Sequence, residues 1–536
     1  MSTARRREPE QPERRAFLAT AAVFGLALAI RTPALAAAVQ EGAAPAPEPA
    51  DAASGATASD GTPFDFEWLV AEAERLAAAD HAPRGMTLPD GFDDLSYDQY
   101  RDIRFARERD PLARSGSPFG MDVLPPGFLF TVPVRVNLVR DGQARPIPFS
   151  LDDFTFGPLA PRPASADGLA HSGFRLRAPI NRPDVLDEIA VFQGASYFRA
   201  VARGERYGLS ARGLSIGTAS ETGEEFPAFT DFWIEVPPAD ATSITLWALL
   251  DSASVSGAYR FEVTPGPETT MRIESVLFPR RDLDDVGIAP LTSMFLFDPS
   301  NRIRFDDYRE AVHDSDGLQM IDGAGERMFR SLANPVQLQV SSFADTDPTA
   351  FGLVQRHRAL RDYEDTEARY DLRPCAWVQP EGNWGEGAVV LVEIPTDAEI
   401  HDNISVLWRP AEPLAAGARH EFAYRLTWTD DPSDDVGIWR FGDLRTGTRD
   451  GLHEIVVYFE RPDGTTGGDL VDPGVELDVS AGEASDVVGS PVGDGARYRV
   501  SFAFDPGESD LAEMRLRLHD TDDRSLSETW LYRWTS

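Results

Sequence analysis

Alternation of apolar and polar residues with a period of two dominates this chain from about residue 118 onward. Side chains in a β-strand point in turn to opposite faces, so this period indicates strands with one buried face. Clear examples lie at residues 128–136, 243–250, 257–263, 336–340 and 388–394. Turn residues separate the runs, and no regular alternation with long helices occurs. We therefore predict an all-β, mainly antiparallel architecture rather than a parallel α/β sheet.

One amphipathic helix is expected before the strands. Apolar residues recur at helical spacing from Phe66 to Ala77, and Thr62 with Pro63 supplies a start signal. A second, short helical piece is predicted at residues 97–105.

The structured region divides into two predicted domains. We place a large β-sandwich domain at residues 63–408 and a linker rich in Pro, Ala and Gly at residues 409–418. Short alternating strands fill residues 419–536, and this length and pattern suit an immunoglobulin-like β-sandwich.

Residues 1–36 are predicted to form a twin-arginine signal peptide. Arg14 and Arg15 precede a short apolar run, and Ala34-Leu35-Ala36 follows as a cleavage site of small residues. The apolar run is too short to span a bilayer, so no permanent membrane anchor is expected. Residues 37–62, rich in Ala and Pro, are predicted to be a disordered leader. We therefore expect a periplasmic protein exported by the twin-arginine route.

Charge and cysteine content narrow the function classes. The chain has 51 basic and 88 acidic residues, a formal net charge of -37, and every basic residue is arginine. Such an acidic excess repels phosphate backbones, so nucleic acid is not an expected partner. The single cysteine, Cys375, cannot form an internal disulfide, and we interpret it as a buried structural thiol.

Two short acidic clusters are the best candidates for chemistry: residues 313–317, His-Asp-Ser-Asp-Gly, and residues 399–403, Glu-Ile-His-Asp-Asn. Two separated carboxylates could act as general acid and general base on a glycosidic bond. An Asx turn in the first cluster and a solvated loop in the second are the structural alternatives. The first cluster lacks the later glutamate of an EF-hand, and His313 and His401 lack partners at metal-ligand spacing. No metal or other cofactor is therefore expected.

Longer motifs carry a resemblance to a known family. They lie in order at residues 194–199, 207–214, 223–227, 289–297, 369–374, 392–396 and 526–530. Together they resemble the periplasmic glucan biosynthesis proteins, the G and D paralogues, over essentially the whole mature chain. The twin-arginine motif resembles the D paralogue. The resemblance implies a galactose-mutarotase-like β-sandwich followed by an immunoglobulin-like domain, and a role in making osmoregulated periplasmic glucans with a β-1,2-linked backbone.

The resemblance also implies a catalytic pair. Some members of the family are glycoside hydrolases that cut β-1,2-glucan internally with inversion. Carried over to this sequence, Asp314 is the general base and Asp402 the general acid. Tyr370 matches a residue that relays protons to the base, although a structural tyrosine is an equal alternative. The same carboxylates would serve a transglycosylase that closes a ring through an α-1,6 link, and a non-catalytic glucan-binding factor is the alternative from another class.

Three further residues are candidates for substrate binding. Glu399 could bind a sugar hydroxyl or raise the pKa of Asp402, or it could be a solvated rim residue. Arg373 and Trp384 are expected in a glucan groove, with a buried ion pair and core packing as the respective alternatives. The expected partners are β-1,2-glucan and either a second copy of the chain or the glucan-synthesis machinery at the inner membrane.

Overall fold

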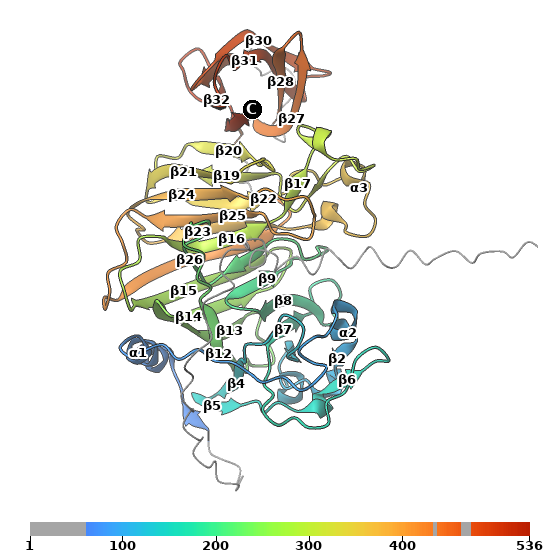
Figure 1. The fold of residues 1–536 in the computed structure, drawn as a ribbon, viewed down its shortest axis with the longest axis vertical. Coiled ribbons are helices and arrows are strands. Elements are labelled where there is room, and N and C mark those ends of the chain that lie inside the picture. The colour runs from blue at the N-terminus through green and yellow to red at the C-terminus, as the bar shows by residue number, and fades with distance from the viewer. Residues whose placement is uncertain (1–60, 433–436, 462–472) are drawn as a thin grey trace, which may run out of the picture.

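The computed structural model describes residues 61–432, 437–461 and 473–536. Strands provide most of the regular structure there, so the all-β prediction is confirmed (Figure 1). The α-helices are α1 (Phe66–Ala77), α2 (Tyr97–Arg101) and α3 (Leu360–Tyr363), and short 3-10 helices are η4 (Arg107–Arg109), η5 (Ala113–Ser115), η6 (Leu151–Asp153), η7 (Arg302–Arg304) and η8 (Tyr370–Leu372). Within the described ranges, none of the helices has the length and apolar composition needed to cross a membrane.

The larger sheet has 15 strands. In spatial order they are β1 (Thr62–Pro63), β5 (Gln143–Pro146), β4 (Arg135–Arg140), β12 (Ala228–Glu235), β13 (Ile244–Asp251), β14 (Val255–Thr264), β15 (Thr269–Pro279), β26 (His420–Thr429), β23 (Cys375–Glu381), β22 (Ala350–Val354), β19 (Gly317–Ile321), β20 (Arg327–Ser331), β33 (Thr529–Thr535), β32 (Leu511–His519) and β29 (Gly474–Val479).

The second sheet faces the central part of the first. Its strands, in spatial order, are β21 (Gln339–Thr346), β24 (Glu386–Glu393), β25 (Ile404–Pro410), β16 (Val286–Ser293), β10 (Ser210–Arg212), β9 (Tyr197–Ala200), β8 (Asp187–Gln193), β7 (Gly173–Ala178) and β3 (Gly120–Leu124), with β11 (Leu214–Ile216) paired to β16. Small two-stranded sheets are β2 (Ile103–Phe105) with β6 (Phe154–Phe156), and β17 (Phe295–Phe297) with β18 (Val312–His313).

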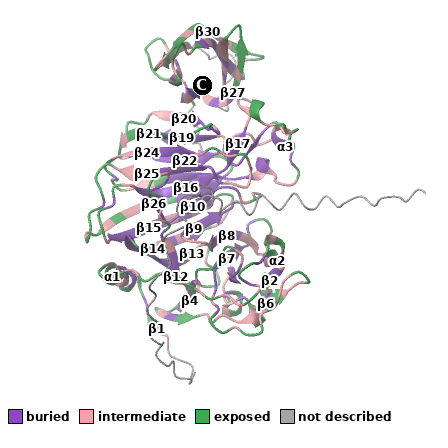
Figure 2. Cartoon of the chain, viewed as in Figure 1, coloured by how far each residue is buried: buried purple, intermediate pink, exposed green. Residues whose placement is uncertain are grey.

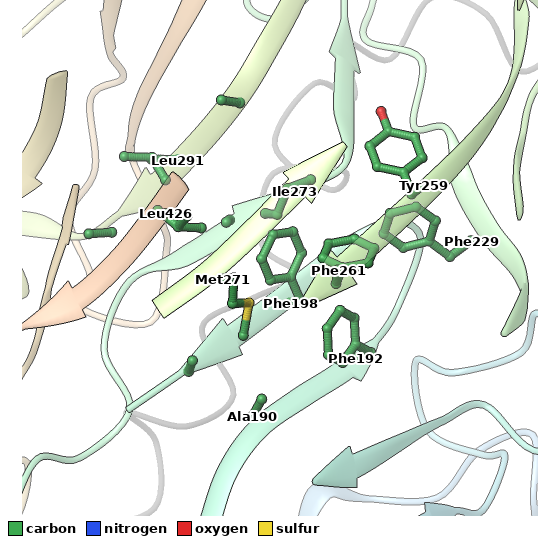
Figure 3. Close-up of a cluster of buried hydrophobic side chains, with 14 of the residues drawn as sticks. Ala190, Phe192, Phe198, Phe229, Tyr259, Phe261, Met271, Ile273, Leu291 and Leu426 are labelled. Atoms are coloured by element: carbon green, nitrogen blue, oxygen red, sulfur yellow. The ribbon is translucent and has the colours of Figure 1, made fainter. Parts of the chain in front are cut away.

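Buried residues concentrate in the strands of the two sheets (Figure 2), and aromatic side chains from both sheets build the main core (Figure 3). Phe192 of β8 and Phe198 of β9 each lie 5.4 Å, centroid to centroid, from Phe261 of β14, at nearly perpendicular ring angles. Such edge-to-face pairs add to the apolar area that the sheets remove from water. Because side chains alternate along a strand, the neighbours of Phe198 must point to the opposite face of the second sheet.

The expected first helix is present, but it begins later than its predicted start signal. The side chain of Asp65 accepts a hydrogen bond from the backbone N–H of Trp68 at 2.8 Å, which caps α1. Thr62 and Pro63 instead form β1, paired with β5. The predicted signal peptide and the leader up to residue 60 lie outside the described residues, and Thr62, the last residue of that predicted leader, belongs to a strand. The second helical piece is α2 alone, since β2 occupies residues 103–105.

The predicted domain boundary is wrong. Residues 409 and 410 end β25 of the second sheet, and residues 411–419 connect it to β26 of the first, which pairs with both β15 and β23. This Pro- and Gly-rich segment is therefore a crossing between the two sheets of the large domain. A linker and a strand-to-strand crossing share the same composition, so the sequence pattern could not separate them.

The second β-sandwich begins after β26. Its four-stranded sheet is β27 (Arg440–Arg449), β28 (Leu452–Glu460), β31 (Arg497–Asp505) and β30 (Glu483–Val492). This sheet packs against β29, β32 and β33 around a separate core that includes Val457, Val500 and Leu516. A parallel pairing of β20 with β33 joins these strands to the large sheet, so one sheet runs through both sandwiches.

Candidate active site

The face of the second sheet that points away from the core is polar. On β9, Phe198 enters the core, whereas Tyr197 and Arg199 point to the other side; on β10, Arg212 does the same. The guanidinium carbon of Arg212 lies 4.6 Å from the centre of the Tyr197 ring. Arg199 and Arg212 are only 6% and 2% exposed. Buried arginines need anionic or polar partners, so this face is built for polar chemistry.

Asp402 lies at this face, near Arg199 and two residues before the start of β25. The neighbouring Asn403 holds its loop in place: Oδ1 accepts the backbone N–H of Phe295 at 2.8 Å, and Nδ2 donates to the carbonyl oxygens of Phe295 and Ile394 at 3.0 Å. Asp402 is 7% exposed. Its Oδ2 lies 3.8 Å from Nη2 of Arg199, beyond hydrogen-bond distance, and is a buried oxygen without a hydrogen-bond partner among the described residues.

Burial gives Asp402 an unusual proton affinity. Loss of solvation raises its pKa to about 7, the charge of Asp314 acts in the same direction, and the cationic Arg199 and Arg212 oppose both. A carboxyl group with this pKa holds its proton in a large fraction of molecules at neutral pH. Asp402 can therefore donate a proton.

Asp314 lies in the three-residue loop between β18 and β19. Its backbone N–H donates to the carbonyl oxygen of Met294 at 2.8 Å, and the residue is 6% exposed. Its side-chain Oδ1 lies 3.5 Å from Nε of Arg373 and has no hydrogen-bond partner in the described ranges. The charge of Asp314 contributes to the raised pKa of Asp402, so the two predicted catalytic carboxylates lie within electrostatic range of each other.

Arg373 serves mainly to place positive charge beside Asp314. Its guanidinium donates to the carbonyl oxygens of Tyr207 and, at 3.0 Å, Ala368. The same group lies 5.3 Å from the centre of the Tyr370 ring. The two carbonyl oxygens fix the orientation of Arg373. Its contact with Asp314 matches the buried ion pair that we named as the alternative to a place in the glucan groove.

Tyr370 and Glu399 also belong to this site. The Tyr370 hydroxyl donates to Oε2 of Glu399 at 3.3 Å, and Nη1 of Arg309 donates to the same oxygen at 2.8 Å. Burial, with the charges of Glu399 and Asp314, raises the pKa of Tyr370 well above its ordinary value. The phenol is therefore protonated at all physiological pH values. It can transfer a proton only if it accepts another one at the same time.

Trp384 does not belong to the site. Its ring packs in the main core against Phe351, Trp408, Phe422 and Tyr424, and its Nε1 donates to the carbonyl oxygen of Ala423 at 3.2 Å. The prediction that it stacks on glucan is wrong, because the turn from β23 to β24 folds the side chain inward. The alternative of core packing is correct.

Sequence reasoning missed three arginines of the site: Arg199, Arg212 and Arg309. Arg212 donates to Oε1 of Glu224 at 2.5 Å, which keeps its charge compensated. Arg199 and Arg212 fall within the motifs at residues 194–199 and 207–214. Arg199 and Arg212 are direct neighbours of the core residues Phe198 and Ala211 on β9 and β10, so strand alternation places both arginines on the face opposite the core.

Cys375 is buried, as expected, and burial raises the pKa of its thiol to about 11. His313 is also buried, and its Nδ1 pairs with Oε1 of Gln355 at 3.0 Å. Among the described residues, no group of three or more His, Cys, Asp or Glu side chains is arranged to hold a metal ion.

Comparisons with known proteins agree with the motifs. A family model described as "Periplasmic glucan biosynthesis protein, MdoG" matches residues 64–534. "Glucans biosynthesis protein G" of Vibrio cholerae is 46% identical over 88% of this chain and 87% of its own length. Proteins with the same name from Shewanella frigidimarina and Rhodopseudomonas palustris are each 44% identical, covering 85% and 95% of their own lengths. These relatives carry the name of the G paralogue, whereas the expected likeness to the D paralogue depended only on the twin-arginine motif.

Among solved structures, a galactose mutarotase related enzyme from Lactobacillus acidophilus aligns with 49% of this chain and 97% of its own, at 8% identity and a TM-score of 0.19. That score is too low to carry an argument. The family match and the identity to full-length relatives do not depend on it. The chain belongs to the periplasmic glucan biosynthesis protein family.

Proposed function

We propose that this protein acts in the biosynthesis of osmoregulated periplasmic glucans as an endo-β-1,2-glucanase that inverts the anomeric configuration. One observation carries the proposal. Within the part of the chain that the structure describes, two buried carboxylates on separate loops, Asp314 and Asp402, each keep an oxygen without a hydrogen-bond partner, and Asp402 has a pKa of about 7. Unsatisfied buried acceptors are costly unless a ligand uses them.

The two carboxyl groups suit the two roles of an inverting hydrolase. The protonated Asp402 donates its proton to the glycosidic oxygen as the bond from that oxygen to the anomeric carbon breaks. Asp314 accepts a proton from the water that attacks the anomeric carbon from the opposite face. One O–H bond of water is broken, one C–O bond is exchanged for another, and the two aspartates end with their protonation states reversed.

Tyr370 fits the relay role better than direct acid or base chemistry. Its hydroxyl donates to Glu399, and the charge of Asp314 contributes to the rise of its pKa. In a relay the neutral phenol accepts the proton of the attacking water while it passes its own proton toward Asp314, so Asp314 still gains the one proton that water loses. Glu399, held by Arg309, orients this hydroxyl and could also accept a hydrogen bond from a sugar.

Incubation of the mature protein with linear β-1,2-glucan tests the proposal. New reducing ends that first appear as the α-anomer, observed by NMR, are the expected result. Products one water lighter and resistant to exo-acting enzymes would instead establish cyclising transglycosylation. Unchanged glucan would contradict both and leave a binding factor. Asp314→Asn and Asp402→Asn should each lower the rate at least 1,000-fold while the far-UV spectrum stays unchanged.

We also propose that the protein works in the periplasm after export by the twin-arginine route. The family description and the Arg14-Arg15 motif support this location. Replacement of both arginines by lysine should retain the precursor in the cytoplasm. Export of that variant at the wild-type rate would refute the route.

A further inference from the structure

Asp316 is the second aspartate of the 313–317 cluster, and the proposed mechanism does not use it. Its Oδ1 pairs with Nδ1 of His357 at 2.5 Å, and its Oδ2 accepts the backbone N–H groups of His357, at 3.0 Å, and of Arg356. Its own N–H donates to the carbonyl oxygen of Val354 at 2.8 Å. Four contacts therefore fasten the loop that carries Asp314 to residues 354–357.

The Asp316–His357 pair is charged at neutral pH. The negative charge of Asp316 raises the pKa of His357 to about 9 against the effect of burial, and Asp443 and Asp362 add to it. His357 in turn holds the pKa of Asp316 far below its usual range. The loop is thus held by charge-assisted hydrogen bonds, which are stronger than neutral ones.

Residue 356, next to His357, connects this segment to the second β-sandwich. Both terminal nitrogens of Arg356 donate to the carboxylate of Glu528 at 2.7 Å, in a bidentate pair. Glu528 is 2% exposed, immediately precedes β33, and also accepts the backbone N–H of Phe441 at 2.8 Å. The guanidinium of Arg356 lies 4.3 Å from the centre of the Phe329 ring.

Val354 and Gln355 are packed inside, whereas residues 356–358 are only partly buried. A cavity of about 820 Å³ lies between the two sandwiches and is bordered by His357, Arg356, Glu528 and Phe441. Where close packing is interrupted, directional polar contacts determine position. The Glu528–Arg356 pair crosses the edge of this cavity.

We propose that Glu528 is a positioning residue for Asp314: through Arg356 and Asp316, the second β-sandwich fixes the loop that carries the catalytic base. This inference rests on the proposed role of Asp314 as that base. The positioning role would assign a function to the closing motif at residues 526–530. This motif lies in the second β-sandwich and provides no group that touches the reacting atoms.

The test compares two ion pairs that join the sandwiches. Glu528→Gln breaks the pair with Arg356. The control, Glu326→Gln, breaks the pair of Glu326 with Arg515 of β32 and weakens the bond that Glu326 accepts from the hydroxyl of Thr529; among the described residues, neither Arg515 nor Thr529 is hydrogen-bonded to Asp316. We expect Glu528→Gln to lower kcat about 10- to 100-fold with KM within about twofold, because a small displacement of a catalytic group has effects of this size. The control Glu326→Gln should keep kcat within about twofold.

Hydrogen exchange gives a second readout that does not need glucan. The amides of Asp314 and Asp316 are bonded to Met294 and Val354, so the peptide that spans residues 312–318 should exchange faster in Glu528→Gln and at the wild-type rate in Glu326→Gln. Should Glu528→Gln fail to fold, Arg356→Lys, which keeps the charge but loses the bidentate geometry, takes its place.

The outcomes separate the two hypotheses. A wild-type protein without activity on β-1,2-glucan refutes the proposed function, and the exchange rates still decide whether Glu528 holds the loop. An active wild type in which Glu528→Gln and Glu326→Gln share the same kcat and the same exchange rates overturns the positioning role. In a double mutant, Asp316→Asn should remove most of the further loss that Glu528→Gln causes, because the Arg356 pair acts through Asp316. The direct bond from Gln319 of β19 to Glu528, at 3.2 Å, accounts for the remainder.

Discussion

The carboxylate of Asp402 and the guanidinium of Arg199 face each other across 3.8 Å, both buried and neither close enough to form a hydrogen bond. The gap leaves Oδ2 of Asp402 and Nε of Arg199 without hydrogen-bond partners among the described residues. Arg199 thus lowers the pKa of Asp402 by its charge alone, while burial raises it further than Arg199 can compensate. This balance sets the pH range in which Asp402 can act as an acid.

The first prediction concerns the basic limb of the pH–rate profile. Asp402 loses its proton as the pH rises through about 7, so kcat/KM should fall about tenfold for each further pH unit. Arg199→Gln removes a charge that lowers this pKa and should move the limb upward by roughly half a pH unit or more. Initial rates from pH 5 to 9 measure both effects. A limb at the same pH in wild type and Arg199→Gln would contradict the assignment of Asp402 as the acid.

The second prediction concerns stability. Since the folded-state pKa of Asp402 lies above its unfolded value, the folded protein binds this proton more tightly; the benefit is complete below about pH 4 and is lost as the pH rises through 7. Asp402→Asn avoids the buried charge and should raise the free energy of unfolding at pH 8 by about 1–2 kcal/mol. Denaturant unfolding at pH 5 and 8 measures this. A mutant that is less stable than wild type at pH 8 would show that the charge is better compensated than we infer.

The third prediction concerns the relay. Tyr370→Phe removes the hydroxyl that donates to Glu399 and should lower kcat about 100-fold with little change in stability. Tyr259→Phe is the matched control, because this buried hydroxyl donates to the carbonyl oxygen of Gly213 at 2.9 Å, in the core. It should cost about 1 kcal/mol of stability and leave kcat unchanged. Equal rates for Tyr370→Phe and wild type would leave Tyr370 as a structural residue.

The fourth prediction tests whether Trp384 belongs to the hydrophobic core or to a glucan-binding groove. Trp384→Ala should lower the free energy of unfolding by about 3–5 kcal/mol, because it opens a cavity among Phe351, Trp408 and Phe422. KM for glucan should stay the same at temperatures where the mutant is folded. Trp384→Phe, which fills part of the space, should be destabilised less. A raised KM with unchanged stability would restore the groove role that the core packing argues against.

The strand pattern predicted the all-β class correctly, because burial on one face leaves a period of two that is visible in the sequence. It could not place the domain boundary, since the crossing between β25 and β26 has the composition of a linker. The motifs found Asp314, Asp402, Tyr370 and Glu399, which the fold brings to one site. Trp384 was misassigned because an aromatic residue near a glycine turn is equally suited to a groove and to a core. The sequence analysis did not identify Arg199, because strand alternation shows that a residue lies on a polar face but not whether that face of the sheet is buried or exposed to solvent.

The pairing of β20 with β33 has a consequence for how the chain is made. Met328 pairs with Thr529, so the sheet shared by both sandwiches stays open at β20 until the residues of β33 have left the ribosome. Until then β20 presents an unpaired edge, the kind of surface through which nascent chains aggregate. Pairings between such distant residues also form slowly. Folding of this sheet should therefore finish only once the residues of β33 are available, and until then a chaperone that covers strand edges would improve the yield.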